Sequence, residues 1–170
     1  EIIQRPTPAA GFDTDVLDDL HRFAALVVGP GLGRSEATIA GVRRLIAEAT
    51  VPMVIDGDGL FAAAWRADAP ASLLRDRGLP TVLTPHDGEF TLLRGTGPAA
   101  DRIAATRELA VDLGCTVLLK GPTTVIADSV GPTLIVDHGD ERLATAGSGD
   151  VLSGMIGTLL ALDVPPARAA

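Results

Sequence analysis

A glycine-rich turn ahead of an apolar helix is the part of this sequence with the clearest chemical meaning. The turn reads Ala146-Gly147-Ser148-Gly149-Asp150, and the apolar run 151–162 follows it. Glycines before a helix let backbone N–H groups point at one ligand, and the helix dipole adds partial positive charge there. The turn therefore predicts an anion hole suited to a phosphate, with the Asp150 carboxylate placed to take a proton from an attacking hydroxyl.

Other interpretations of the turn limit this hypothesis. The same residues fit an ordinary helix cap with an aspartate in the first turn. A Walker A loop requires Gly-x-x-x-x-Gly-Lys-Ser/Thr, which the chain lacks, and Gly29-Pro30-Gly31-Leu32-Gly33 has the wrong spacing for a dinucleotide-binding Gly-x-Gly-x-x-Gly. Any bound phosphate must be held in a different manner.

Four short apolar segments position further polar residues. The segments that follow them are Gly29 to Gly33, Asp56 to Gly59, Thr84 to Glu89 and Lys120 to Thr124. In a parallel sheet, ligands bind just beyond the carboxyl ends of the strands, so we expect these segments to share one edge. Lys120 is the only lysine of the chain, and this uniqueness with its glycine neighbour favours a phosphate contact over the alternative of a solvated strand-end charge.

The alternation of apolar strands and helices predicts one α/β domain over residues 1–170, with a mostly parallel sheet covered on both faces. Strands are expected at 24–28, 52–55, 80–84 and 116–120, and a late antiparallel edge hairpin at 124–136. Helices are expected at 13–23, after Ser35 as N-cap, after Gly59 through Trp65, at 98–113 and at 151–162.

Composition excludes several classes of protein. Hydrophobic residues make up 46% of the 170 residues, as in a globular domain, and the net charge of −8 argues against binding to nucleic-acid backbones. No apolar run approaches the length of a membrane span. Cys115 is the only cysteine, so an internal disulfide is impossible, and we expect a reducing, cytoplasmic compartment.

Five motifs in sequence order resemble those of ADP-dependent NAD(P)H-hydrate dehydratases, a family of the ribokinase-like superfamily. They are Gly29-Pro30-Gly31-Leu32-Gly33, Asp56-Gly57-Asp58-Gly59-Leu60, Thr84-Pro85-His86-Asp87-Gly88-Glu89, Lys120-Gly121-Pro122-Thr123-Thr124 and Ala146-Gly147-Ser148-Gly149-Asp150-Val151-Leu152. The set covers most of the chain, and Thr-Pro-His-x-Gly-Glu is its most specific member. The resemblance implies a ribokinase-like fold.

The resemblance also implies an activity. The family restores NADH and NADPH from their hydrates, NADHX and NADPHX: ADP or ATP phosphorylates the hydrate hydroxyl in the presence of Mg²⁺, and phosphate is then eliminated. It further implies a homo-oligomer, and an NAD(P)HX epimerase as partner or fused domain. In this family the domain begins before Glu1 and continues beyond Ala170, so the chain is expected to be a fragment of a longer domain.

Site residues carry over by position. Asp150 matches the catalytic base, and Gly147, Ser148 and Gly149 match the anion hole. Positions that match the binding site of the hydrated nicotinamide are Gly31, Gly33, Asp56, His86, Glu89 and Asp150. Positions that match nucleotide contacts are Lys120, Gly121, Thr123, Thr124, Thr145, Ala146 and Gly149. Glu89 also lies in the motif that helps to place magnesium.

The chain departs from the family pattern at several positions. Asp87 stands where the family has proline and adds charge near a phosphate site, Ser148 replaces threonine, and two glycines replace the alanines of Asp-Ala-Asp-Ala. Asp56 and Asp58 also fit simple turn formers, and His86 a structural turn histidine. Residues expected only at the surface or in packing are His21, Trp65, Cys115 and His138.

Two rival functions remain open at this point. A small-molecule kinase of the same superfamily would share the Gly-Ser-Gly-Asp chemistry but lack the Thr-Pro-His-x-Gly-Glu motif. A non-catalytic nucleotide-binding domain would not require Asp150 and Lys120.

Overall fold

The computed structural model describes residues 11–64 and 72–170 and is built around one six-stranded sheet with the order β1-β2-β3-β4-β5-β6. The strands are β1 (Leu26–Val28), β2 (Met53–Ile55), β3 (Thr81–Leu83), β4 (Thr116–Leu119), β5 (Thr124–Ala127) and β6 (Leu134–Val136). Strands β1 to β4 run parallel to one another, whereas β5 pairs antiparallel with both β4 and β6. The predicted sheet with its late antiparallel edge is confirmed.

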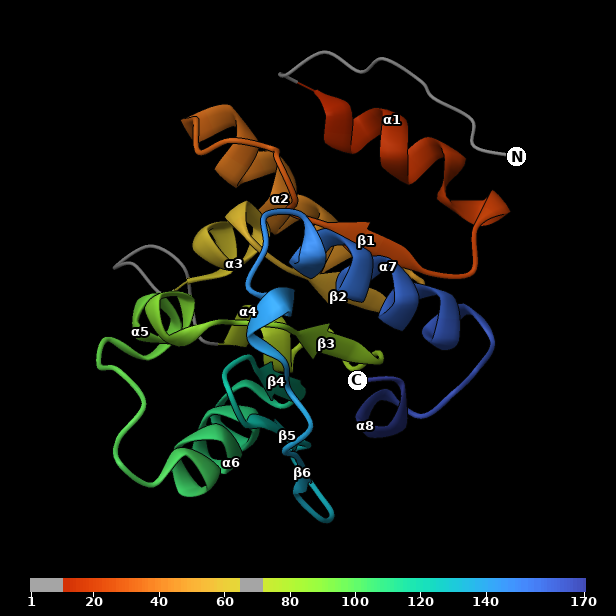
Figure 1. Cartoon of the computed structure of the whole chain (residues 1–170). Helices are drawn as coiled ribbons and strands as arrows, with labels where there is room; N and C mark the ends of the chain where they lie inside the picture. Colours follow the sequence, from red (N-terminus) through yellow and green to blue (C-terminus); the bar gives the residue numbers. More distant parts are fainter. Residues whose placement is uncertain (1–10, 65–71) are drawn as a thin grey trace.

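Helices lie on both faces of the sheet, but unequally (Figure 1). On one face α7 (Ser148–Ala161) packs across β1 and β2, and the short α8 (Pro166–Ala169) contacts β3. The remaining α-helices belong to the opposite side: α1 (Phe12–Asp19), α2 (Glu36–Glu48), α3 (Asp58–Ala63), α4 (Ser72–Arg75), α5 (Asp87–Arg94) and α6 (Arg102–Leu113). Two 3₁₀ turns are η1 (Leu20–Arg22) and the exposed η2 (Glu141–Leu143). No helix among the described residues is long and apolar enough to cross a membrane.

The strands β2, β3 and β4 are buried at every residue. Alternate side chains point to opposite faces, so Met53 and Ile55 join the larger core beneath α2 to α6, while Val54 joins the smaller core beneath α7 and α8. This two-sided burial explains the nearly continuous apolar strands of the sequence.

Helix caps explain where the sequence-based boundaries hold and where they fail. Ser35 caps α2 as predicted, because its hydroxyl accepts a hydrogen bond from the Thr38 amide at 3.1 Å. The expected helix at 98–113 is wrong at its start: α6 begins at Arg102, capped by Asp101, whose carboxylate accepts from the Ala104 amide at 2.9 Å. The separate helix α5 before it, and the short helices α4 and α8, were not predicted.

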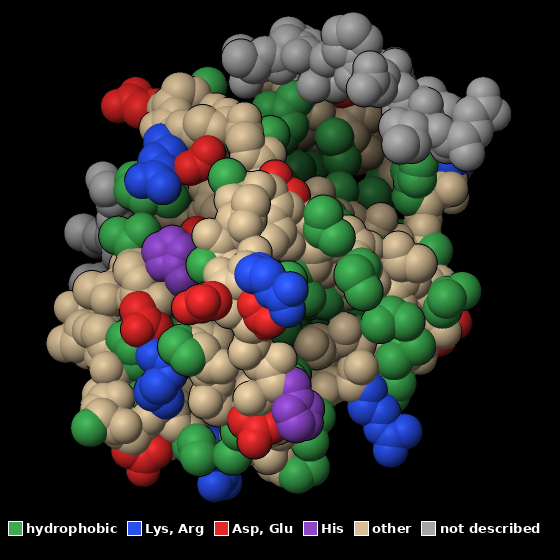
Figure 2. Space-filling view, in the orientation of Figure 1, with side chains coloured by type: hydrophobic (Ala, Val, Ile, Leu, Met, Phe, Trp, Pro, Cys, Tyr) green, Lys and Arg blue, Asp and Glu red, His purple; other side chains and the backbone are tan. Residues whose placement is uncertain are grey.

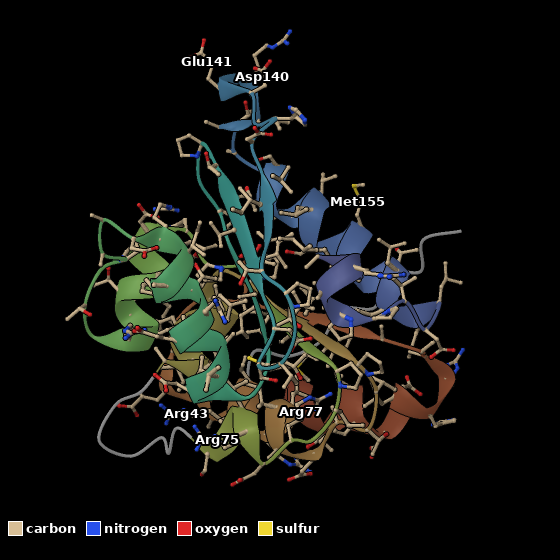
Figure 3. All side chains as sticks on the ribbon, turned by 90° about the horizontal axis from the view of Figure 1, so that it is seen from below. Arg43, Arg75, Arg77, Asp140, Glu141 and Met155 are labelled. Carbon is tan, nitrogen blue, oxygen red and sulfur yellow. The ribbon has the colours of Figure 1, made fainter. Side chains whose placement is uncertain are left out.

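Arg77 stabilises the end of the molecule opposite Asp140 and Glu141 (Figure 3). Its guanidinium donates to the carbonyls of Ile46, at 3.1 Å, and Ala49, at 2.8 Å, near the C-terminus of α2, and also to the Val51 carbonyl. Burial lowers the pKa of Arg77. Arg77 thus supplies side-chain hydrogen bonds to carbonyls at the end of this helix, beside the backbone bond from the Ala49 amide to the Leu45 carbonyl.

The residues expected to have only structural roles can be placed, with one exception. His21 and His138 are exposed, and Cys115 is buried beside the start of β4, as predicted. Trp65, with the end of the helix expected there, lies outside the described residues.

Candidate active site

Three charged side chains from separate sequence motifs meet at the carboxyl ends of the parallel strands. Lys120 follows β4, and its Nζ lies 2.9 Å from Oδ1 of Asp56, which follows β2, and 3.7 Å from Oε2 of Glu89, in α5. Asp56 is only 3% exposed and Glu89 8%. The prediction that these motifs share one edge of the sheet is confirmed, and Lys120 is no simple solvated charge.

The glycine-rich turn lies against this cluster. A Cβ atom on Gly149 would lie 3.4 Å from Oδ2 of Asp56 and 3.7 Å from Nζ of Lys120. Gly147 forms the N-cap of α7 with a left-handed φ of 91°, and no side chain caps the helix. Asp150 is in the first turn of α7 and exposed, next to Gly149. The helix N-terminus, one ammonium group and three carboxylates therefore share one small region.

Part of the expected anion hole is already engaged by the chain itself. The Ser148 amide donates to the Thr145 carbonyl at 3.1 Å, and the Thr145 hydroxyl donates to the Arg142 carbonyl at 2.8 Å. Thr145 and Ala146 are exposed beside the turn. The Ser148 amide, one of the hydrogen-bond donors expected to face a phosphate, therefore bonds to the preceding loop.

Ser153 is a site residue that the sequence analysis missed. It lies one turn beyond Asp150 on α7, is fully buried, and donates from Oγ to Oδ2 of Asp56 at 2.8 Å. Ser153 lies within the apolar segment 151–162, so the sequence pattern predicted only a packing role for this part of the helix. A serine in an otherwise largely apolar segment was the signal that could have identified it.

The loop 29–33 is fastened to the loop after β2. Gly29 has a φ of 128°, and a Cβ atom there would lie 1.8 Å from the Asp56 carbonyl oxygen, so the two backbones approach too closely for any side chain. Oδ2 of Asp58 accepts from the Gly33 amide at 2.9 Å, and Oδ1 accepts from Nε of Arg34 at 2.7 Å. The hydrogen bond from Arg34, together with the Gly33 amide, lowers the pKa of Asp58.

Asp58 is therefore an anchor for the loop and more than the turn former considered above. Gly31, with a φ of 68°, lies exposed in the middle of this loop, and Gly33 is exposed at its end.

His86 forms the N-cap of α5. Its Nδ1 accepts from the Gly88 amide at 3.0 Å and the Glu89 amide at 3.3 Å, and Oε2 of Glu89 accepts from the His86 amide at 2.9 Å. This is a capping box in which histidine takes the place of serine or threonine. The imidazole is 59% exposed in its side chain, so the structural role leaves part of the ring accessible to a ligand.

Arg102 ties two motifs together. It donates to Oδ1 of Asp87 at 2.7 Å and to the Lys120 carbonyl at 3.1 Å, beside Gly121. The Lys120 amide also donates to the Pro85 carbonyl at 2.8 Å. The extra charge of Asp87 is thus paired with a guanidinium. Thr123 is exposed in the following turn, and Thr124 begins β5.

Comparison with known proteins agrees with this arrangement. The sequence model of the NAD(P)H-hydrate dehydratase family matches residues 1–170. The bifunctional NAD(P)H-hydrate repair enzyme Nnr of Mycobacterium tuberculosis (strain CDC 1551 / Oshkosh) is 49% identical over 170 residues, which is 100% of this chain and 33% of that protein. The chain therefore spans about a third of the length of this relative.

Solved structures agree in fold. The ADP/ATP-dependent NAD(P)H-hydrate dehydratase of Bacillus subtilis, co-crystallised with ATP and Mg²⁺, superposes with a TM-score of 0.71 at 33% identity, covering 86% of this chain and 50% of that one. A ribokinase-like superfamily protein of Enterococcus faecalis gives a TM-score of 0.71 at 24% identity, over 87% of this chain and 51% of that one, and confirms the expected fold. By its full-length match to the family model and its shared fold, the chain belongs to the NAD(P)H-hydrate dehydratase family.

Proposed function

We propose that the protein restores NADH and NADPH from their hydrates, NADHX and NADPHX, with ADP or ATP as phosphoryl donor and Mg²⁺ as the accompanying ion. The observation that carries the proposal is the position of Lys120 and Asp56 against Gly149, at the N-terminus of α7. This arrangement supplies a cation and a helix dipole where a phosphate would be held. The Bacillus subtilis relative is named as ADP/ATP-dependent.

In the first step, the hydroxyl oxygen of the hydrate attacks the terminal phosphorus of the nucleotide. A new O–P bond forms as the bond to the leaving nucleotide oxygen breaks, and the hydroxyl proton passes to the carboxylate of Asp150, exposed in the first turn of α7. Lys120 and the backbone amides of Gly147 and Gly149 stabilise the negative charge that develops on the phosphoryl oxygens, since the Ser148 amide bonds to the Thr145 carbonyl.

In the second step, the C–O bond to the phosphate breaks and phosphate leaves with the bonding electrons. The neighbouring ring carbon loses a proton to water, the electrons of the broken C–H bond form the C=C bond, and the reduced nicotinamide is restored. Gly31, Gly33, Asp56, His86 and Glu89 are the proposed contacts of the hydrated nicotinamide, and Lys120, Gly121, Thr123, Thr124, Thr145, Ala146 and Gly149 those of the nucleotide.

Glu89 fits the role of a single protein carboxylate toward magnesium. Its hydrogen bond to the His86 amide and its contact with Lys120 both use Oε2, which leaves Oε1 for the ion. The described residues contain no group of three or more metal-ligating side chains. Mg²⁺ commonly requires only one or two carboxylates when phosphate oxygens and water complete its shell, and there it neutralises phosphate charge.

Three further expectations are part of the proposal: a cytoplasmic location, assembly into a homo-oligomer, and cooperation with an NAD(P)HX epimerase. The last has a parallel in the Mycobacterium tuberculosis relative, which is named as bifunctional and of which this chain spans 33%.

An absorbance assay at the band of reduced nicotinamide tests the proposal. The protein at its natural full length is mixed with NADHX or NADPHX, Mg²⁺ and either ADP or ATP. A rise in absorbance that requires the nucleotide is the expected result, and it identifies the donor. No rise, with nucleotide binding intact, would refute the dehydratase reaction and favour the kinase alternative.

A further inference from the structure

The buried face of α7 contains one polar side chain whose partner lies in the active site. The residues of this face are Ser153, Ile156, Gly157 and Leu160. Ser153 is 0% exposed. A buried hydroxyl without a hydrogen-bond partner is destabilising, so the choice of partner at this position is informative.

Ser153 does not bond to its own helix in the usual way. A helical serine or threonine commonly donates to the carbonyl four residues earlier, as Thr158 of the same helix does to Gly154 at 2.9 Å. The Ser153 hydroxyl instead donates to Oδ2 of Asp56, a residue 97 positions away in the sequence, at 2.8 Å. The hydrogen bond therefore links α7 to the end of β2.

Asp56 connects the hydroxyl of Ser153 to the ammonium group of Lys120. Its Oδ2 accepts from Ser153 and its Oδ1 accepts from Nζ of Lys120 at 2.9 Å, so the carboxylate has a partner on each oxygen. The terminal torsion of an aspartate is otherwise broad, and the four-carbon stem of a lysine is flexible. Two hydrogen bonds in series restrict both.

We propose that Ser153 is a positioning residue: through Asp56 it fixes the ammonium group of Lys120 beside Gly149, at the N-terminus of α7. The catalytic part of this inference rests on the proposed function, because there Lys120 meets the transferring phosphoryl group. Its structural part, the restraint of Lys120, stands independently of any reaction.

Acylation of the Lys120 amine tests the structural part. The chain has a single lysine, and peptide mass analysis of the full-length protein follows that residue alone. We expect Ser153→Ala to accelerate acylation severalfold, Asp56→Asn to accelerate it further, and Ser153→Thr, which keeps the hydroxyl, to react more like the parent. Thr158→Ala, which removes a hydroxyl from the same helix, is the matched control and should leave the rate unchanged. Equal rates in the parent and Ser153→Ala would overturn the proposal.

Two further measurements keep the test decisive. Should Ser153→Ala unfold, Ser153→Cys replaces the hydroxyl with a much weaker donor and supports the same comparison. For turnover, kcat/KM should fall about tenfold in Ser153→Ala, with no further loss when Ser153→Ala is added to Asp56→Asn. Independent, multiplicative losses would refute a role through Asp56. A parent without activity would refute the proposed function, while the acylation rates would still decide the role of Ser153.

Discussion

Asp150 is the residue on which the chemistry of the proposed reaction depends most directly. It is exposed in the first turn of α7, so its substitution disturbs little packing. We expect Asp150→Asn to lower kcat by about 10² to 10⁴, the usual contribution of a general base, while the thermal midpoint stays close to that of the parent.

The NADH absorbance assay and a melting curve measure both effects. Glu36→Gln, which removes a carboxylate from the first turn of α2, controls for loss of charge at a helix N-terminus. Near-normal turnover in Asp150→Asn would show that the base is another residue.

In the proposed function, the ammonium group of Lys120 binds a phosphate of the nucleotide. We expect Lys120→Ala to weaken ADP and ATP binding by roughly 1.5–3 kcal/mol, the range for hydrogen bonds to charged groups. It should also lower stability, because Asp56, only 3% exposed, would lose its cationic partner. Titration calorimetry gives the dissociation constants, and the exposed Arg107→Ala on α6 is a control for loss of positive charge. Unchanged nucleotide affinity in Lys120→Ala would exclude the phosphate contact.

Sequence motifs identified Asp56, Glu89 and Lys120 because each follows an apolar strand, and parallel strands end at one edge. The same reasoning could not identify Ser153, whose importance depends on a partner 97 residues away. It also left the role of His86 open, since a histidine N-cap has the spacing of a capping box without its usual residue types. The assignments to the nicotinamide and to the nucleotide remain predictions.

At the scale of elements, β2, β3 and β4 were predictable because burial on both faces leaves a continuous apolar run. The helices α4, α5 and α8 were not, because they are short and their bounds depend on local hydrogen bonds and turns. α5 is defined by the His86 cap and ends at Gly95, whose φ of 83° terminates the helix. The residues between Gly95 and Asp101 then form a connection, where an early start of α6 had been predicted.

Far from the site, Arg77 links the C-terminal end of α2 to the start of β3. Its guanidinium serves the carbonyls of Ile46, Ala49 and Val51, and its Nε donates to the Thr81 hydroxyl at 3.0 Å. Arg77→Leu would leave these acceptors unpaired, and we expect the free energy of unfolding to fall by about 3 kcal/mol. Urea denaturation measures the change, with Arg107→Leu on the exposed face of α6 as the control. A loss no larger than in the control would show that water replaces these hydrogen bonds.

At the scale of the whole molecule, α7 is apolar on its outer side as well as on its buried side. The exposed apolar residues of this helix are Val151, Met155 and Leu159, and Leu162 follows at its C-terminus. Figure 2 shows hydrophobic side chains gathered over this part of the face, and in Figure 3 Met155 points away from the sheet. A helix that is hydrophobic all round is usually buried on all sides. Among the described residues, only the face of α7 that packs on the sheet is buried.

Because of Cys115, we expect the stability of the whole domain to fall as the pH rises in the alkaline range. Burial, with a smaller contribution from the charge of Asp128, raises the pKa of its thiol from 9.0 to about 12. The folded chain therefore keeps a proton that the unfolded chain loses above pH 9. The stabilisation is fully present below pH 9, and between pH 9 and 12 the free energy of unfolding should fall by about 1.4 kcal/mol per pH unit.

The composition makes this prediction unusually testable, because the sequence has no tyrosine and Lys120 is its only lysine. Few other side chains titrate in that range. Urea denaturation of the parent and of Cys115→Ala, under reducing conditions from pH 8 to 11, gives the two slopes. Cys115→Ala lacks the thiol, so its stability should be lower at pH 8 but much less dependent on pH. Parallel slopes would show that the thiol ionises as readily in the folded chain as in the unfolded one, and that the start of β4 opens to solvent without global unfolding.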